Sequence, residues 1–184
     1  MPLSPPAPRA LWHERTVRCR GYRRDDGLWD IEGSLTDTKT YSFANHDRDG
    51  IAAGEPVHGM AARLTVDDGL AIRDAEAAID HGPFHPCAEA AGGVRDLVGA
   101  TIRPGFRRTV QGALGGTAGC THLRTLLEAL AQTAAQTVPA ARDARVAGDG
   151  DSPPALLGSC HALRRDGPVA RREWPEWAAG DGDE

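Results

Sequence analysis

Closely spaced cysteines, long apolar runs and basic stretches are all missing from this sequence. The four cysteines, at positions 19, 87, 120 and 160, form no CxxC redox motif and no zinc-ribbon spacing. No apolar run approaches the roughly 20 residues that span a bilayer, and the first residues lack the pattern of a secretory signal. A net charge of −5 with 5% aromatic residues gives little support to nucleic-acid binding. These absences predict a cytoplasmic protein that binds neither nucleic acid nor membrane.

The chain is long enough for one domain with a core of its own, at 184 residues. Residues 1–9 carry four prolines and are predicted to form a disordered arm. Residues 10–138 carry the alternating and helical patterns of a single α+β domain. Residues 139–184 are rich in proline, glycine and aspartate and poor in core-forming side chains, so they are predicted to be a loosely ordered tail.

Period-two alternation predicts the sheet of this domain. In residues 28–35, large apolar side chains alternate with acidic and hydroxyl side chains, which is typical of a strand with one buried face. Residues 56–66 alternate in the same way and place His58 on the apolar face. A shorter strand is expected over residues 37–43, and Asp-Gly turns predict hairpins. The expected fold class is α+β, an antiparallel sheet of about five strands with helices packed on one face.

The strongest helical pattern follows the glycine-rich stretch Gly-Gly-Thr-Ala-Gly-Cys-Thr-His-Leu at residues 115–123. Apolar residues then recur at steps of three and four as far as Val138, which predicts a helix with one buried stripe that ends before Pro139. Cys120 lies at the start of this helix, where free N–H groups and the helix dipole favour a thiolate. His122, two residues later, can act as a base or as a metal ligand.

Three motifs carry a resemblance that spans most of the chain. They are Arg-Arg-Asp-Asp-Gly-Leu-Trp-Asp-Ile-Glu-Gly at 23–33, Pro-Val-His-Gly-Met at 56–60 and Gly-Cys-Thr-His-Leu at 119–123. Together they resemble a bacterial family of small proteins of undefined function. The resemblance covers roughly residues 11–138 and implies no activity.

Residues 54–135 also resemble, more distantly, the NifU-like iron–sulfur cluster scaffold and its SufE-like sulfur-acceptor relatives. The segment Gly-Glu-Pro-Val-His-Gly matches the first element of that family, with His58 in place of the first cysteine. Cys87 and Cys120, each at the start of a predicted helix, fall at the second and third cysteines. The resemblance therefore implies a NifU/SufE-like core in which these three side chains meet at one end of the sheet.

Two departures from that family concern the site itself. Met60 stands where the family has an acidic residue, and His122 follows the third cysteine instead of preceding it. With His122 included, the resemblance implies a metal site made of His58, Cys87, Cys120 and His122. Thiolates and imidazoles at tetrahedral spacing suit zinc or iron.

The leading hypothesis is therefore a metal-binding protein, with Zn or Fe at a His/Cys site, of the iron–sulfur scaffold or sulfur-transfer type. Its expected partner is a sulfur-donor protein or a second copy of the chain. An alternative is a small enzyme that uses Cys120 as nucleophile with His58 or His122 as base, or a bound metal as Lewis acid. A third is a binding or oligomerisation module in which these residues only pack.

Overall fold

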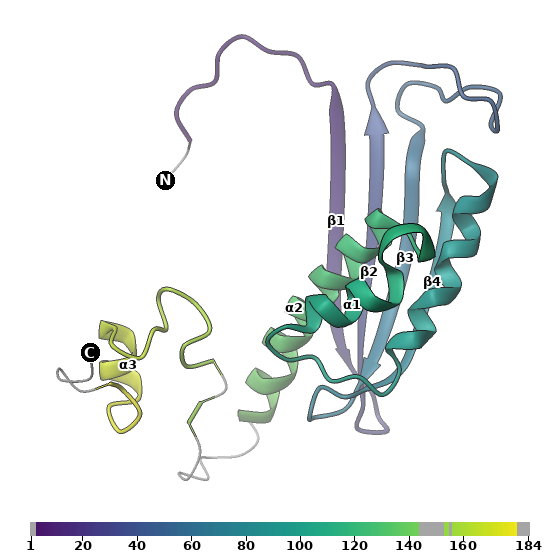
Figure 1. Ribbon diagram of the computed structural model, residues 1–184. Coiled ribbons are helices and arrows are strands. Elements are labelled where there is room, and N and C mark those ends of the chain that lie inside the picture. The colour runs from purple at the N-terminus through teal and green to yellow at the C-terminus, as the bar shows by residue number, and fades with distance from the viewer. Residues whose placement is uncertain (1–2, 144–152, 155, 180–184) are drawn as a thin grey trace. The chain divides into compact units, whose positions relative to one another are not determined.

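The computed structural model describes residues 3–143, 153–154 and 156–179, and the chain divides into two compact units, Met1–Val138 and Pro139–Glu184. The first unit is α+β, as the alternation and the helical stripe predict (Figure 1). The described part of the second unit contains one short helix, α3 (Pro168–Glu173), closed by a hydrogen bond of 2.8 Å from the N–H of Trp174 to the carbonyl of Ala170. None of the helices in the described residues is long and apolar enough to cross a membrane.

The sheet of the first unit is an antiparallel meander whose strands lie side by side in chain order, namely β1 (His13–Arg23), β2 (Trp29–Lys39), β3 (Pro56–Val66) and β4 (Ile72–His81). It has four strands instead of about five. The residues expected to start a separate short strand instead extend β2 as far as Lys39. Beyond it, Phe43 forms only an isolated bridge with Ile51.

The register of the sheet brings side chains from three strands into one row. The turn after β1 contains Gly27, whose φ of 88° is readily adopted by glycine. The turn joins β1 to β2, and the pairing of these two strands places Arg15 opposite Asp37. The pairing of β2 with β3 places Asp37 opposite His58. Because opposed residues on neighbouring strands share a face, these three side chains lie next to one another.

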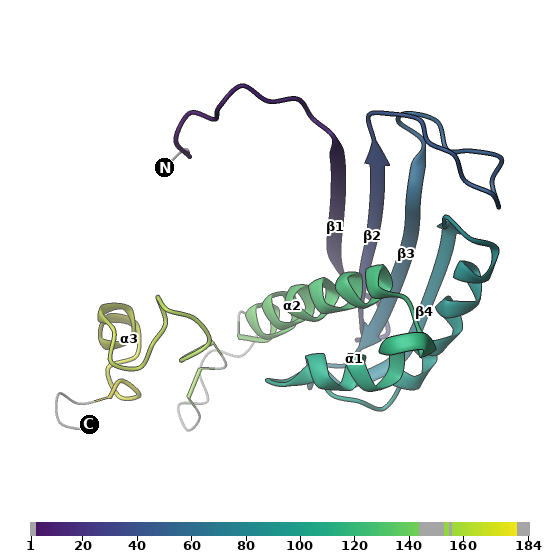
Figure 2. The same cartoon turned by 45° about the horizontal axis from the view of Figure 1, so that its top comes forward.

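All the helical segments of this unit cover one face of the sheet (Figure 2), and they are η1 (His85–Leu97), α1 (Phe106–Leu114), η2 (Gly116–Ala118) and α2 (Thr121–Asp143). The predicted apolar stripe of α2 is buried, and it comprises Leu123, Leu126, Leu127, Leu130, Ala131, Ala134 and Val138. The helix continues through Pro139 to Asp143 instead of ending before the proline. Pro139 lies inside the helix, close to its C-terminal end, where it removes one backbone donor from the pattern of hydrogen bonds.

Gly33 of β2 lets α2 approach the sheet closely. A Cβ atom at this position would lie 2.7 Å from Leu130 Cδ2 and 2.9 Å from Leu126 Cδ1. We expect Gly33→Val to lower the free energy of unfolding by about 1–3 kcal/mol in urea denaturation, because the core has no room for the added atoms. Gly112→Ala on α1 is the control, since a Cβ there meets nothing within 4 Å. Equal stability of Gly33→Val and the wild type would contradict the close packing.

Candidate metal centre

A buried carboxylate, Asp37, lies near the end of β2 on the face that the helices cover. Its side chain is 3% exposed. Arg15 donates two hydrogen bonds to it, from Nε to Oδ1 and from Nη2 to Oδ2, both of 2.7 Å, and His13 Nε2 lies 3.2 Å from Oδ1. Burial raises the pKa of Asp37, but the hydrogen bonds and charge of Arg15, together with His13, lower it to about 2. Asp37 is therefore ionised at neutral pH.

Two imidazoles from different elements converge on Asp37. Nδ1 of His58, on β3, lies 3.0 Å from Oδ2, and Nε2 of His122, in the first turn of α2, lies 3.7 Å from the same atom. The two rings stack, with centroids 3.7 Å apart and planes inclined by 29°. One ligand atom from each of the three residues lies within 4.8 Å of the other two, and no other such group of three is found in the described residues. We call Asp37, His58 and His122 the carboxylate–histidine cluster.

Both imidazoles of the cluster favour the neutral form. Desolvation by burial lowers the pKa of His58, and the attraction of Asp37 offsets this only in part. Burial also lowers the pKa of His122, as does repulsion from His58 and Arg15. A neutral imidazole has the free lone pair that binds a metal ion, so the cluster is ready to act as a ligand set at neutral pH.

Cys120 lies beside the cluster but does not belong to it. It directly precedes α2, and its carbonyl accepts a hydrogen bond of 3.0 Å from the N–H of Arg124. Its Sγ lies 3.8 Å from Nδ1 of His122. The structure therefore brings Cys120 to His122, while the ligand atoms that meet at Asp37 are nitrogens and oxygens.

A groove of about 760 Å³ opens next to the two imidazoles. Its lining is mostly apolar and includes Met60, Ile79, Pro83, Phe84 and Pro86. Cys87, in η1, lines this groove, as does Cys120, although neither is part of the carboxylate–histidine cluster. The volume is that of a site for a small molecule.

The donor set of the cluster fits Zn²⁺ or Fe²⁺. Metal–nitrogen distances near 2.0–2.1 Å in a tetrahedral site separate neighbouring donor atoms by about 3.3 Å. The distances from Oδ2 of Asp37 to Nδ1 of His58, 3.0 Å, and to Nε2 of His122, 3.7 Å, lie on either side of this value. Ligation by Nδ1 of His58 would require the tautomer that carries its proton on Nε2, so the contact of 3.0 Å between Nδ1 and Oδ2 of Asp37 would be replaced by bonds from both atoms to the ion. Arg15 and His13 would remain as outer residues that hold the carboxylate in place.

Sequence reasoning finds two members of the cluster, His58 and His122, and overlooks Asp37. The signal for Asp37 is the alternation that starts at Trp29, because continuing it by one more pair of residues beyond Leu35 places Asp37 on the buried face. Assigning a new strand to residues 37–43 interrupts that alternation and hides the buried carboxylate.

The comparisons with known proteins place the chain in a family. The family described as "Protein of unknown function (DUF2889)" matches residues 13–136. The chain belongs to this family. The DUF2889 match includes the cluster, Arg15 and both groove cysteines, and it is consistent with the family of undefined function expected from the three motifs. No curated protein and no solved structure matches the chain, and the NifU-like resemblance has no counterpart among these findings.

Proposed function

We propose that this protein binds one divalent metal ion, Zn²⁺ or Fe²⁺, through Asp37, His58 and His122. The observation that supports the proposal is the meeting of one ionised carboxylate and two imidazoles, from β2, β3 and α2, at donor separations suited to one ion. Two imidazoles and one carboxylate are a recurrent ligand set of zinc hydrolases and of iron(II) oxygenases.

Three protein ligands favour a catalytic ion over a structural one, because they leave at least one coordination position for water or substrate. A bound ion would supply Lewis acidity or an activated water. In this chain, the groove beside His58 and His122 would bind the organic substrate, and Arg15 would keep Asp37 oriented and ionised. We therefore infer a metal-dependent enzyme that acts on a small molecule with an apolar body.

Metal titration tests this proposal directly. The full chain would be stripped with a chelator and titrated by calorimetry with Zn²⁺, and with Fe²⁺ under anaerobic conditions. We expect one ion per chain with micromolar or tighter affinity, and much weaker binding of Mg²⁺, which prefers oxygen ligands. If neither Zn²⁺ nor Fe²⁺ bound at one ion per chain, the proposal would be wrong.

A second candidate function is supported by the order of three side chains. Sγ of Cys120 lies 3.8 Å from Nδ1 of His122, and Nε2 of His122 lies 3.7 Å from Oδ2 of Asp37. A thiol, an imidazole and a carboxylate in this order are the nucleophile, base and orienting group of a cysteine enzyme. The groove would again hold the substrate, since Cys120 lines it.

Cys120→Ser separates the two candidates. If the metal ion is held by the cluster alone, the variant should bind Zn²⁺ with an affinity within about threefold of the wild type, because sulfur is not among the three ligands. If Cys120 is the nucleophile, iodoacetamide should modify the wild type quickly at one site, and His122→Gln should slow that reaction. Loss of zinc binding in Cys120→Ser would instead support the His/Cys ligand set expected from the sequence.

The iron–sulfur scaffold or sulfur-transfer role remains a narrower proposal. Its support is that Cys87 and Cys120 both line the groove beside the imidazoles, where a sulfur-donor protein would deliver its cargo. Anaerobic reconstitution with iron and sulfide would test it. We expect visible absorption of a cluster that is lost in the variant Cys87→Ser/Cys120→Ser, and a wild-type protein that stays colourless would contradict this role.

A further inference from the structure

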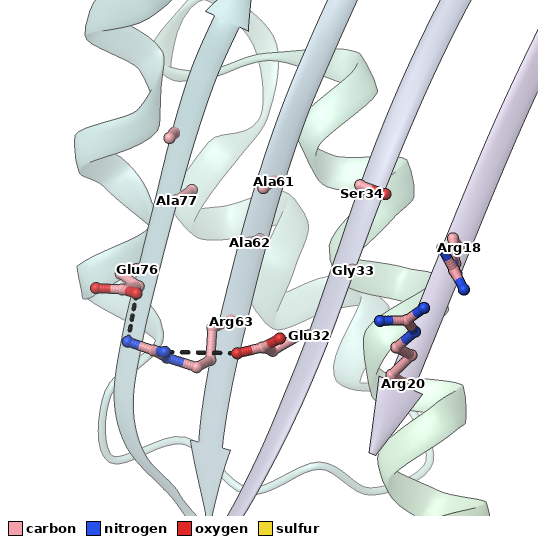
Figure 3. A pocket seen from close by; sticks show the side chains of 11 residues that line it. Arg18, Arg20, Glu32, Gly33, Ser34, Ala61, Ala62, Arg63, Glu76 and Ala77 are labelled. Atoms are coloured by element: carbon pink, nitrogen blue, oxygen red, sulfur yellow. Dashed lines mark hydrogen bonds and ion pairs between the residues drawn. The ribbon is translucent and has the colours of Figure 1, made fainter. Parts of the chain in front are cut away.

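The face of the sheet opposite the helices carries an ordered pattern of charged and small side chains. Figure 3 shows this open face with Arg18 and Arg20 on β1, Glu32 and Ser34 on β2, and Arg63 on β3. No helical segment of the first unit covers it (Figures 1 and 2). One face of an antiparallel sheet is often exposed to water. Exposure alone therefore does not indicate a binding surface, and the evidence for one is the arrangement of charged and small side chains on this face.

One row across the open face alternates in charge. The strand register places Arg20, Glu32, Arg63 and Glu76 opposite one another, from β1 to β4. Arg63 donates to both acids, from Nη1 to Glu32 over 3.5 Å and from Nη2 to Glu76 over 2.5 Å. Arg20 contacts Tyr22 Oη at 3.4 Å and has no carboxylate partner among the described residues. The charges in this row therefore alternate from positive on β1 to negative on β4, and the guanidinium of Arg20 at the β1 end has no carboxylate partner among the described residues.

The neighbouring row contains one long side chain and three short ones. It consists of Arg18, Ser34, Ala61 and Ala78, in the same order of strands. The short side chains leave a shallow hollow of about 370 Å³ on β2 to β4, while Arg18 stands at its β1 side. In this row the side chain of Arg18 projects on β1, and the short side chains leave a depression that extends to β4.

We propose that this open face is a two-fold interface between two copies of the chain. A two-fold axis parallel to the strands, between β2 and β3, lays β1 of one copy over β4 of the other. Such an isologous contact requires each row of side chains, read from β1 to β4, to be complementary to the same row read from β4 to β1. The charged row meets this requirement, because Arg20 then faces the partner subunit's Glu76, and Glu32 faces the partner subunit's Arg63.

The same operation suits the rows on either side. Arg18 is laid over the partner subunit's Ala78, where the hollow accepts a long side chain. In the row formed by Tyr22, Asp30, Thr65 and Asp74, reversal sets Tyr22 against the partner subunit's Asp74 and Asp30 against the partner subunit's Thr65. No like charges are opposed in any of the three rows.

The area and spacing of the face fit a dimer. Four strands about 4.8 Å apart and about ten residues long at ~3.3 Å per residue offer roughly 600 Å² per copy. Two such faces reach the lower end of the roughly 1,200–2,000 Å² that specific interfaces bury. Sheets stack about 10 Å apart, a distance that opposed arginine and glutamate side chains can bridge.

Charge reversal with rescue tests the interface on the full chain by sedimentation equilibrium. We expect the wild type to have twice the chain mass of 19.5 kDa at micromolar concentration. Arg20→Glu sets two acids against each other at two equivalent positions and should weaken the dimer at least about tenfold. Glu76→Arg alone should have the same effect. The double variant Arg20→Glu/Glu76→Arg should restore the dimer, although within one copy the introduced guanidinium lies next to Arg63.

Arg107→Glu is the matched control, because Arg107 is exposed on α1, on the other side of the sheet. It should leave the dimer unchanged. A monomeric wild type would overturn the proposal. The open face would then be exposed to water or would bind something other than a second copy of the chain. A dimer that Arg20→Glu does not weaken, or that the double variant does not restore, would also overturn it.

Discussion

His122→Ala should lower the affinity of the protein for Zn²⁺ or Fe²⁺ by at least about 100-fold. The substitution removes one of three ligands, and the remaining carboxylate and imidazole hold an ion far less tightly; even outer residues of metal sites change affinity by about 10–100-fold. His58→Ala should have the same effect for the same reason. Calorimetric titration of chelator-stripped protein measures both losses, and circular dichroism checks that the variants stay folded.

The other histidines provide graded controls. His85 is exposed in η1 and is not part of the carboxylate–histidine cluster, so His85→Ala should leave the affinity unchanged. His13 contacts Asp37 without being one of the three ligands, and His13→Ala should cost about tenfold or less. If His122→Ala bound Zn²⁺ as tightly as His85→Ala, the ion would have to lie elsewhere in the chain.

Asp37→Ala should destabilise the metal-free protein by about 2–4 kcal/mol at pH 7. The substitution leaves Arg15 and His58 without the carboxylate that they both contact. Breaking a buried ion pair from one side costs about 3–5 kcal/mol. Arg15 is 37% exposed and regains part of its hydration, so we expect a loss about 1 kcal/mol smaller than this range. Urea denaturation at pH 7 measures it.

The pH dependence of this effect has a definite sign. The pKa of Asp37 is lowered from 3.8 to about 2 in the folded protein, so the unfolded chain takes up the proton at the higher pH. The stability that Asp37 contributes is therefore fully present above about pH 4 and is lost as the pH falls towards 2. The difference in free energy of unfolding between the wild type and Asp37→Ala should not fall from pH 7 to 5, because Asp37 also favours the protonated form of His58, and it should shrink below pH 4.

Arg15→Leu/Asp37→Leu is the control for this interpretation. Replacing both charges by apolar side chains leaves no unpaired ion, so the double variant should be more stable than Asp37→Ala. Its free energy of unfolding should also lack the decrease between pH 4 and 2 that protonation of Asp37 causes in the wild type. A difference between the wild type and Asp37→Ala that stays the same from pH 4 to 2 would show that the ionised form of Asp37 does not stabilise the fold.

The secondary structure was largely predictable because its signals are local. Alternation over Trp29–Leu35 and over the segment containing His58 identifies strands and their buried faces without knowledge of their partners. The stripe that begins at Leu123 identifies the face of α2 that packs on the sheet. The end of β2 was missed because the polar and hydroxyl residues after Leu35 resemble a break between strands, although Asp37 continues the alternation.

The sequence by itself thus determined the α+β class, the position of His58 on the face of β3 that the helices cover, and the placement of Cys120 and His122 at the start of the long helix. Only the tertiary structure decided which of these side chains meet. The strand register sets Asp37 between Arg15 and His58, and the packing of α2 across the end of the sheet stacks His122 on His58. Local periodicity specifies the face of a residue but not its neighbour on another element, because that neighbour depends on contacts between segments far apart in the chain. For this reason a carboxylate, and not the sulfur of Cys87 or Cys120, completes the cluster.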